Sequence, residues 1–127
     1  MKLLRLASAG AGLVCFLTIA FGQVADLSGT WIGTAVMMDG SEDTVMLVLK
    51  KDDKSYTGTI SDTIGHLAPG TPVSNFSLEK NEVKFGFTIV GGSAITVTVT
   101  VEGDKMKGKW DDGQDEGGLI ELTRKKV

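Results

Sequence analysis

Residues 95–101 alternate strictly between apolar and polar side chains, and this pattern constrains the fold more than any other feature of the chain. Ile95, Val97, Val99 and Val101 fall on one face of an extended strand, and threonines fall on the other. Because successive side chains of a strand point to opposite sides of its sheet, the pattern predicts one buried and one solvated face. The chain after residue 22 has no stretch of useful length with a helical period.

Seven further segments are equally short, rich in Val, Ile, Thr or aromatic residues, and bounded by Gly, Asp, Asn or Pro. The predicted strands are residues 29–38, 44–51, 55–61, 73–80, 82–90, 93–102, 105–110 and 118–124. Most connections are brief, so consecutive strands should be antiparallel neighbours. They can stack as a sandwich or close as a barrel, and closure also removes exposed edges. We therefore expect an all-β fold, a single eight-stranded antiparallel up-and-down barrel.

A unit of the form apolar-x-Gly-x-apolar recurs around Gly29, Gly58 and Gly108. In each case the glycine shares the inward face with two larger side chains. We expect such a glycine to leave room for a bulky neighbour and to let the strand bend, as a small barrel requires.

The first 22 residues have the features of a secretory signal peptide. Lys2 and Arg5 precede an apolar run that closes on Ala20, Phe21 and Gly22, with small residues where a signal peptidase needs them. A membrane anchor needs roughly 20 apolar residues, and this run is short and broken by glycine. We expect cleavage after Gly22, a barrel domain over residues 23–127 without a membrane span, and a secreted or periplasmic location.

Removal of the leader changes both the cysteine content and the charge. Cys15, the only cysteine, lies within the leader, so the mature chain would have no disulfide and no thiol. Lys2 and Arg5 leave with it, which reduces 13 basic residues to 11 against 16 acidic ones and moves the formal charge from -3 to -5. Nucleic acid and anionic membrane surfaces are therefore not expected partners.

The triplet Gly29-Thr30-Trp31 at the start of the first strand resembles the calycin group of barrels, which includes the lipocalins and avidins. The resemblance implies that Trp31 lies across the closed end of the barrel and that Arg124, in the last strand, packs over it. The chain lacks the lipocalin Thr-Asp-Tyr signature, C-terminal helix and cysteines, and most of the avidin aromatic wall. More generally it resembles small exported bacterial barrel proteins that share no assigned activity.

The longest predicted connections emerge at one end of such a barrel, where we expect its mouth. This end also collects carboxylates, and its loops contain no Lys or Arg. A rim of this kind would attract cations or a basic partner through its negative field. The rim carboxylates are Asp39, Glu42, Asp43, Asp62, Asp111, Asp112, Asp115 and Glu116.

Aromatic residues on the inward faces are the candidates for contact with a ligand. They are Trp31, Tyr56, Phe85, Phe87 and Trp110.

The acidic segment 111–117 is a candidate calcium site, with Asp111, Asp112, Asp115 and Glu116 as oxygen ligands on a glycine-flexible loop. We expect no cofactor, with calcium at this segment as the one possibility. The segment departs from the EF-hand pattern, because Glu116 stands where that loop needs glycine and Leu122 where it needs a bidentate Glu. A solvated acidic turn is the alternative.

The sequence does not indicate an enzyme. It contains no nucleophile motif, histidine pair or phosphate-binding loop, and the lone His66 falls in the longest predicted loop. We expect an exported, non-catalytic binding module that takes a small apolar ligand in the barrel mouth or a cationic partner, such as a basic protein, on the acidic rim. The alternative is an envelope or extracellular interaction protein with a packed core and no ligand cavity, since side chains can fill an eight-stranded barrel.

Overall fold

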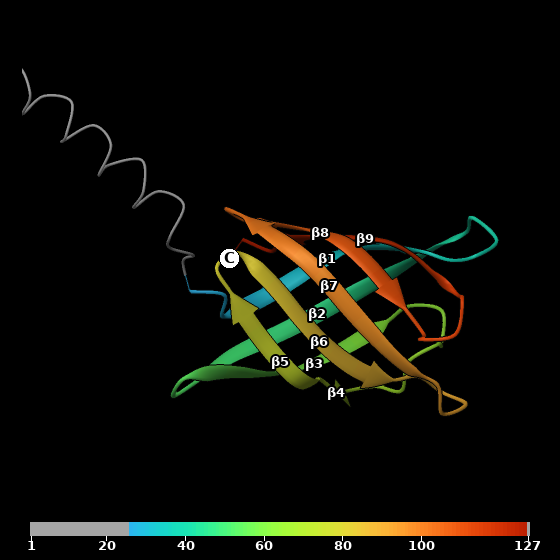
Figure 1. The fold of residues 1–127 in the computed structure, drawn as a ribbon, viewed down its shortest axis with the longest axis horizontal. Helices are drawn as coiled ribbons and strands as arrows, with labels where there is room; N and C mark the ends of the chain where they lie inside the picture. Colours follow the sequence, from blue (N-terminus) through green and yellow to red (C-terminus); the bar gives the residue numbers. More distant parts are fainter. Residues whose placement is uncertain (1–25, 127) are drawn as a thin grey trace, which may run out of the picture.

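The computed structural model describes residues 26–126, and the predicted signal peptide lies outside the described residues. One antiparallel sheet curls into a nearly closed barrel (Figure 1). Within residues 26–126 there is no helix, and hence none that is long and apolar enough to cross a membrane. The strands are β1 (Gly29–Val36), β2 (Glu42–Asp52), β3 (Ser55–Asp62), β4 (Thr71–Pro72), β5 (Ser74–Glu79), β6 (Glu82–Thr88), β7 (Ala94–Glu102), β8 (Lys105–Asp111) and β9 (Gly117–Arg124).

The strand order confirms the all-β, antiparallel up-and-down fold. Neighbours in the sheet follow the order β4-β3-β2-β1-β9-β8-β7-β6-β5, so the first long strand pairs with the last. In the β1–β9 ladder Trp31 stands opposite Arg124, and Ala35 opposite Ile120. The two ends of this order are β4 and β5, and because β4 is only two residues long, the remaining gap in the sheet lies mainly between β3 and β5.

The prediction of eight strands was wrong by one, because the expected strand 73–80 begins earlier and is split in two. Its first part, β4, pairs with Thr59 and Ile60 of β3, whereas β5 pairs with β6 on the other side of the gap. Between them the Val73 N–H donates a 2.9 Å hydrogen bond to the Gly58 carbonyl. Asn75 then has a positive φ of 53°, within an irregular stretch of the β5–β6 register. One continuous segment therefore changes partner across the gap.

Inward-facing glycines let adjacent strands approach closely. A Cβ on Gly33, Gly58 or Gly108 would collide with a backbone carbonyl oxygen of the neighbouring strand. At Gly108 the expected space is occupied by backbone, and at Gly58 by the Val48 carbonyl together with the Leu49 side chain. The expected contribution of these glycines to strand bending stays a prediction. Gly29 has a different reason, since its φ of 128° disfavours any other residue.

The interior is packed by the apolar residues that the alternation placed inward. In β7, Ile95, Val97, Val99 and Val101 are all buried, as predicted, and the threonines between them are more exposed. The most deeply buried large side chains are Trp31, Phe85, Leu27, Leu47, Leu49, Ile60, Met106 and Leu122.

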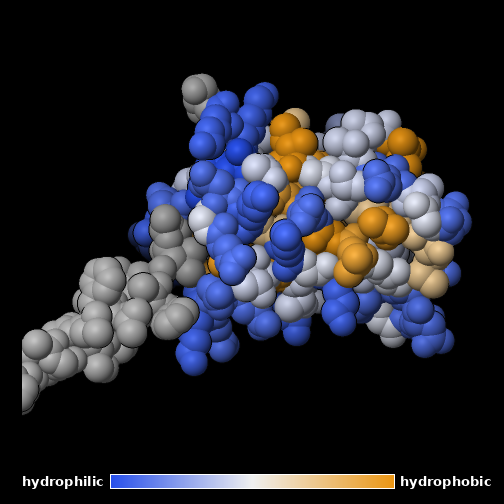
Figure 2. All heavy atoms as spheres, turned by 90° about the horizontal axis from the view of Figure 1, so that it is seen from above, coloured by the Kyte–Doolittle hydropathy of each residue, from blue (hydrophilic) through white to orange (hydrophobic). Residues whose placement is uncertain are grey.

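The two ends of the barrel differ in the length of their connections, as expected. The tight turns after β2, β5 and β7 lie at one end, on the left of Figure 1, and the longer connections lie at the right. Figure 2 keeps the same left and right and shows apolar surface in orange mainly at the centre and right. Met38, Ile64 and Val90, in the longer connections, have 58%, 55% and 63% of their surface exposed.

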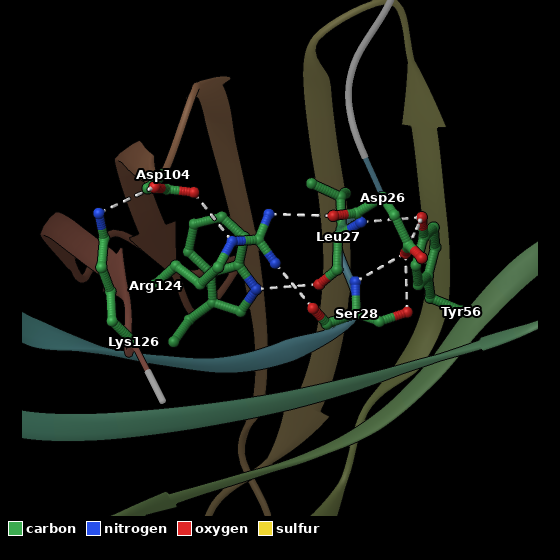
Figure 3. A network of polar contacts seen from close by, with 8 residues as sticks. Asp26, Leu27, Ser28, Tyr56, Asp104, Arg124 and Lys126 are labelled. Atoms are coloured by element: carbon green, nitrogen blue, oxygen red, sulfur yellow. Dashed lines mark hydrogen bonds and ion pairs between the residues drawn. The ribbon is translucent and has the colours of Figure 1, made fainter.

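The end with tight turns is closed by a network around Trp31 and Arg124 (Figure 3). The Trp31 indole N–H donates to the Leu27 carbonyl at 3.0 Å, and the Arg124 guanidinium lies 4.4 Å above the indole ring. Arg124 also donates to the Ser28 carbonyl at 2.7 Å and to Asp104 at 3.0 Å. The placement of these two residues that the calycin resemblance implied is therefore confirmed.

Candidate functional site: a cavity at the long-loop end

A cavity of about 400 Å³ opens at the end of the barrel that carries the longer connections. Its walls come from the parts of the strands nearest the longer connections, where most of the inward side chains are small or branched. The apolar residues on these walls include Ala35, Val45, Ile60, Ile95, Val97 and Ile120. The interior is therefore solid near Trp31 and hollow near the mouth.

The segment between β3 and β4 folds over part of this mouth. The Asp62 carboxylate accepts hydrogen bonds from the backbone N–H groups of His66 at 2.9 Å and Leu67 at 3.2 Å. The His66 carbonyl in turn accepts from the Val90 N–H, at 2.9 Å, in the β6–β7 connection. As a result Leu67 is buried, and both His66 and Leu67 line the cavity.

Asp43 is the buried acidic group of the cavity. It occupies the same inward face of β2 as Val45 and Leu47, and only 3% of its surface is exposed. Its Oδ1 atom has no hydrogen-bond donor among residues 26–126. The neighbouring side chain is that of Asp62, a second carboxylate, which when ionised can only accept.

The proximity of the Asp43 and Asp62 carboxyl groups shifts their pKa values in opposite directions. Burial, reinforced by the facing Asp62 carboxylate, raises the pKa of Asp43 to about 6. Burial also acts to raise the pKa of Asp62, but hydrogen bonds from Asp43 and from backbone N–H groups of residues 65–67 outweigh it. The pKa of Asp62 therefore lies below its usual value, and Asp43 is the group that takes up a proton first.

Two of the five aromatic candidates line the cavity. Phe87 and Trp110 form part of its wall, and the Trp110 indole N–H donates to the Val36 carbonyl at 2.9 Å, which fixes the ring. Trp31 and Phe85 are instead buried in the packed part of the core, outside the cavity lining.

Tyr56, a further aromatic candidate, belongs to the closed end. Its hydroxyl accepts from the Leu27 N–H at 3.0 Å and donates to the Asp26 carboxylate at 3.1 Å (Figure 3). Its ring packs on Phe76 across the gap between β3 and β5, with centroids 5.3 Å apart. The aromatic candidates thus divide between a cavity pair and a set that stabilises the barrel.

In the acidic segment 111–117, which begins at the last residue of β8, two carboxylates accept hydrogen bonds from the segment's own backbone. Asp111 accepts from the Gly113 N–H at 3.0 Å, and Asp112 accepts from the N–H groups of Gln114 and Glu116 at 2.8 and 3.1 Å. Within the part of the chain that the structure describes, no three potential metal ligands come together, so Asp111, Asp112, Asp115 and Glu116 do not form the expected calcium cluster. Asp112 and Glu116 line the cavity instead.

Sequence reasoning placed Asp43 on the rim and missed its buried position. The signal was present, because Asp43 stands two residues before Val45 and keeps the inward phase of β2 through Leu49. Its charge suggested an exposed loop, whereas the strand begins at Glu42, earlier than expected.

Comparison with known proteins supports the fold. Neither the family models nor the curated proteins contain a match to this chain. Among solved structures it is similar to a de novo designed fluorescence-activating β-barrel, with a TM-score of 0.53, 17% identity, and coverage of 78% of this chain and 94% of the design. At this identity the likeness extends to the barrel fold alone, and membership of the calycin group is not shown.

Proposed function

We propose that the chain is a non-catalytic binding protein that takes a small, largely apolar molecule into the cavity at its long-loop end. The cavity itself carries this proposal. Its volume of about 400 Å³ falls within the range of roughly 300–1,000 Å³ that is usual for small-molecule sites. Its lining is mostly apolar and includes a few polar groups, as such sites require to orient a ligand.

The closed end supplies the rigid base of this site. Packing, hydrogen bonds and the cation–π contact hold this end together around Trp31, Leu27 and Arg124. The cavity walls, which are formed by the same strands, are therefore held in place. A preformed site of this kind avoids part of the ordering cost of binding. The exposed side chains of Met38, Ile64 and Val90 in the connections at the mouth end would favour the approach of an apolar molecule.

The alternative of an interaction protein with a filled core has less support. The core is filled around Trp31 but not around Ala35 and Val97, which line the cavity. A designed barrel of the same fold is described as fluorescence-activating, which suits a binding role for this architecture.

Export remains part of the proposal. It rests on the leader pattern of residues 1–22, and a secreted or periplasmic location follows from it. Mass spectrometry of the protein recovered from the producing cell tests this step, because cleavage after Gly22 leaves a chain that begins at Gln23. Recovery of the full chain with its leader intact would contradict export by cleavage.

Binding can be tested with naphthylmethanol, a small neutral aromatic alcohol, by isothermal titration calorimetry. Ser93 is an exposed residue at the cavity, so Ser93→Trp should obstruct the mouth without disturbing the core. Thr57→Trp is the matched control, because Thr57 is exposed on β3 outside the cavity lining.

We expect one molecule of the alcohol to bind per chain, with an affinity that falls about tenfold or more in Ser93→Trp, a loss of ~1.4 kcal/mol. The Thr57→Trp variant should bind like the original chain. Binding that is absent, or equal in both variants, would refute the cavity as the binding site.

A further inference from the structure

We propose that the cavity selects small apolar amines, with the ammonium group seated against the Asp43 carboxylate and the hydrocarbon part held by the apolar walls. This inference rests on the proposed function and names the class of ligand. It is carried by the charges, the burial and the aromatic side chains of the cavity together.

The charged groups of the cavity favour a cation. Four carboxylates line it, and none of the lining residues that the structure describes is Lys or Arg. The one basic side chain is that of His66. A fatty acid or another anion would be repelled by these four carboxylates, whereas an ammonium would be attracted. The carboxylates are those of Asp39, Asp43, Asp112 and Glu116.

Asp43 gives this negative charge a definite point of contact. With 3% of its surface exposed, the side chain has lost most of its contact with water, and Oδ1 has no donor among residues 26–126. The carboxylate accepts from the Thr63 backbone N–H, but leaving the buried Oδ1 atom without a donor is costly, and the neighbouring Asp62 carboxylate adds repulsion. A ligand ammonium would supply both the missing donor and the missing charge.

The other three carboxylates of the cavity are either hydrogen-bonded within their own loops or exposed to water, unlike Asp43. Asp39 accepts from the N–H and hydroxyl of Ser41 at 3.0 and 2.6 Å, and Asp112 accepts from its own loop. Asp39 and Glu116 are also exposed to water. These three groups set the sign of the field at the mouth, and Asp43 provides the buried contact.

The aromatic residues of the cavity complete the arrangement. Phe87 and Trp110 line the same cavity as Asp43, and the Trp110 ring is held by its hydrogen bond to Val36. Aromatic faces attract ammonium groups and also pack on hydrocarbon. An anionic group combined with aromatic faces in an apolar cavity is suited to an amine that carries a hydrocarbon body.

The test compares two probes of nearly equal size, naphthylmethylamine and naphthylmethanol, which differ in an ammonium and a hydroxyl group. Calorimetric titration at neutral pH gives the affinity ratio of amine to alcohol in the original chain. The same ratio is measured in Asp43→Asn, which keeps the side-chain shape and removes the charge. Asp53→Asn makes the same change in the exposed β2–β3 turn, outside the cavity lining, and is the matched control.

We expect the amine to bind at least about tenfold more tightly than the alcohol, and this preference to vanish in Asp43→Asn. Asp53→Asn should retain it. Alcohol binding that Ser93→Trp weakens, together with no preference for the amine or a preference that survives in Asp43→Asn, would overturn this inference and leave the proposed function intact. Absence of binding by both probes would overturn both proposals.

Discussion

The Arg124 guanidinium lies over the Trp31 indole, with its central carbon 4.4 Å from the ring centroid, and the two residues also face each other in the β1–β9 ladder. This contact therefore joins the first and last long strands of the barrel at the same level as their backbone pairing. Two hydrogen bonds from the guanidinium, to the carbonyls of Ser28 and Asp26, attach the segment before β1 to the same point, and a third, to the Asp104 carboxylate, attaches the turn between β7 and β8.

Replacing Arg124 should destabilise the barrel well beyond the effect of an exposed charge. Arg124→Met keeps the apolar stem but removes the hydrogen bonds and the cation over Trp31, so we expect a loss of about 2–4 kcal/mol in the free energy of unfolding. Arg124→Lys should recover only part of it, because an ammonium lacks the planar fork. Urea denaturation measures both values.

Lys107→Met is the control for that experiment. Lys107 forms an ion pair with Glu121 at 3.3 Å, but the two side chains are 62% and 60% exposed. Such pairs contribute roughly 0–1 kcal/mol. Equal losses in Arg124→Met and Lys107→Met would contradict the role assigned to Arg124.

The Asp43–Asp62 pair should make the stability of the fold depend on pH. The pKa of Asp43 is raised from 3.8 to about 6 in the folded chain, so between these values the folded chain holds a proton that the unfolded chain has released. The free energy of unfolding should therefore fall as pH rises through this window. Asp62 acts in the opposite sense, because its pKa is lowered in the folded chain. Its ionised carboxylate stabilises the fold at higher pH, and this stabilisation is lost as pH falls through the lowered pKa.

Asp43→Asn should remove the first of these effects. An amide is uncharged at every pH and can donate to Asp62. We therefore expect the free energy of unfolding to rise by on the order of 1–2 kcal/mol at neutral pH, and to depend less on pH between 3.8 and about 6, the ordinary and the raised pKa of Asp43. Thermal or urea denaturation along a pH series is the measurement. A variant less stable than the original chain at neutral pH would contradict the assigned repulsion. The variant should then be more stable and yet lose its preference for the amine over the alcohol, which separates loss of the site from loss of the fold.

Amine binding should itself weaken below pH 6. Protonation of Asp43, whose pKa in the folded chain is about 6, removes the charge that an ammonium contacts. We expect the affinity for naphthylmethylamine to decrease up to about tenfold for each unit below that pKa, while that for naphthylmethanol changes little. The ionisable groups that face Asp43 or the same cavity are Asp62, His66, Asp39, Asp112 and Glu116.

His66 needs a separate control in this series, because it is the one basic side chain among the described residues that line the cavity. His66→Gln replaces it with a side chain that carries no charge. If the pH dependence persists in His66→Gln and disappears in Asp43→Asn, the carboxyl group is responsible. The reverse pattern would assign it to His66.

The segment over the mouth should depend on Asp62. Asp62→Ala removes the acceptor of the His66 and Leu67 N–H groups, so hydrogen exchange at these two amides should accelerate markedly. The amides of Gly113 and Gln114, which are held by Asp111 and Asp112, provide the internal control and should be unchanged. Unaltered exchange at residues 66 and 67 would contradict the proposed anchoring.

Two glycines provide a matched test of the close strand approach. A Cβ at Gly108 would collide with the Thr98 carbonyl, whereas at Gly86 the nearest atom, the Ile95 carbonyl oxygen, is 3.3 Å away. Gly108→Ala should therefore cost more than about 3 kcal/mol and Gly86→Ala about 1 kcal/mol or less. Similar costs, measured by denaturation, would show that stability does not depend on the close approach of the strands at Gly108.

Local patterns accounted for most of the barrel. Period-two alternation identified the long strands, since each buries one face, and the position of Trp31 and Arg124 agreed with the calycin resemblance. The partner change at Val73 could not be predicted, because it depends on β3 and β6, which lie on opposite sides of the gap. The prediction of a calcium site in the acidic segment was wrong for a local reason, because Asp111 and Asp112 accept hydrogen bonds from nearby backbone N–H groups of the same segment.

For the candidate site, the sequence indicated the end of the barrel at which the cavity opens and two of the aromatic residues that line it, Phe87 and Trp110. The calycin resemblance implied that Trp31 lies at the closed end, but nothing in the sequence indicated that Phe85 would be buried in the packed part of the core. Alternation gives the face of a residue but not its position along the barrel axis. Asp43 could have been recognised from its phase in β2.

The change of partner between β4 and β5 also bears on the order in which the barrel folds. The strands on either side of it, β1–β4 and β5–β9, pair with neighbours close in sequence and need only short loops to close. The β1–β9 ladder joins residues from the two ends of the domain and carries a larger loop-closure entropy. We expect it to form last. Until then β1 and β9 each present an open edge, so the unclosed chain is the form in which aggregation would begin.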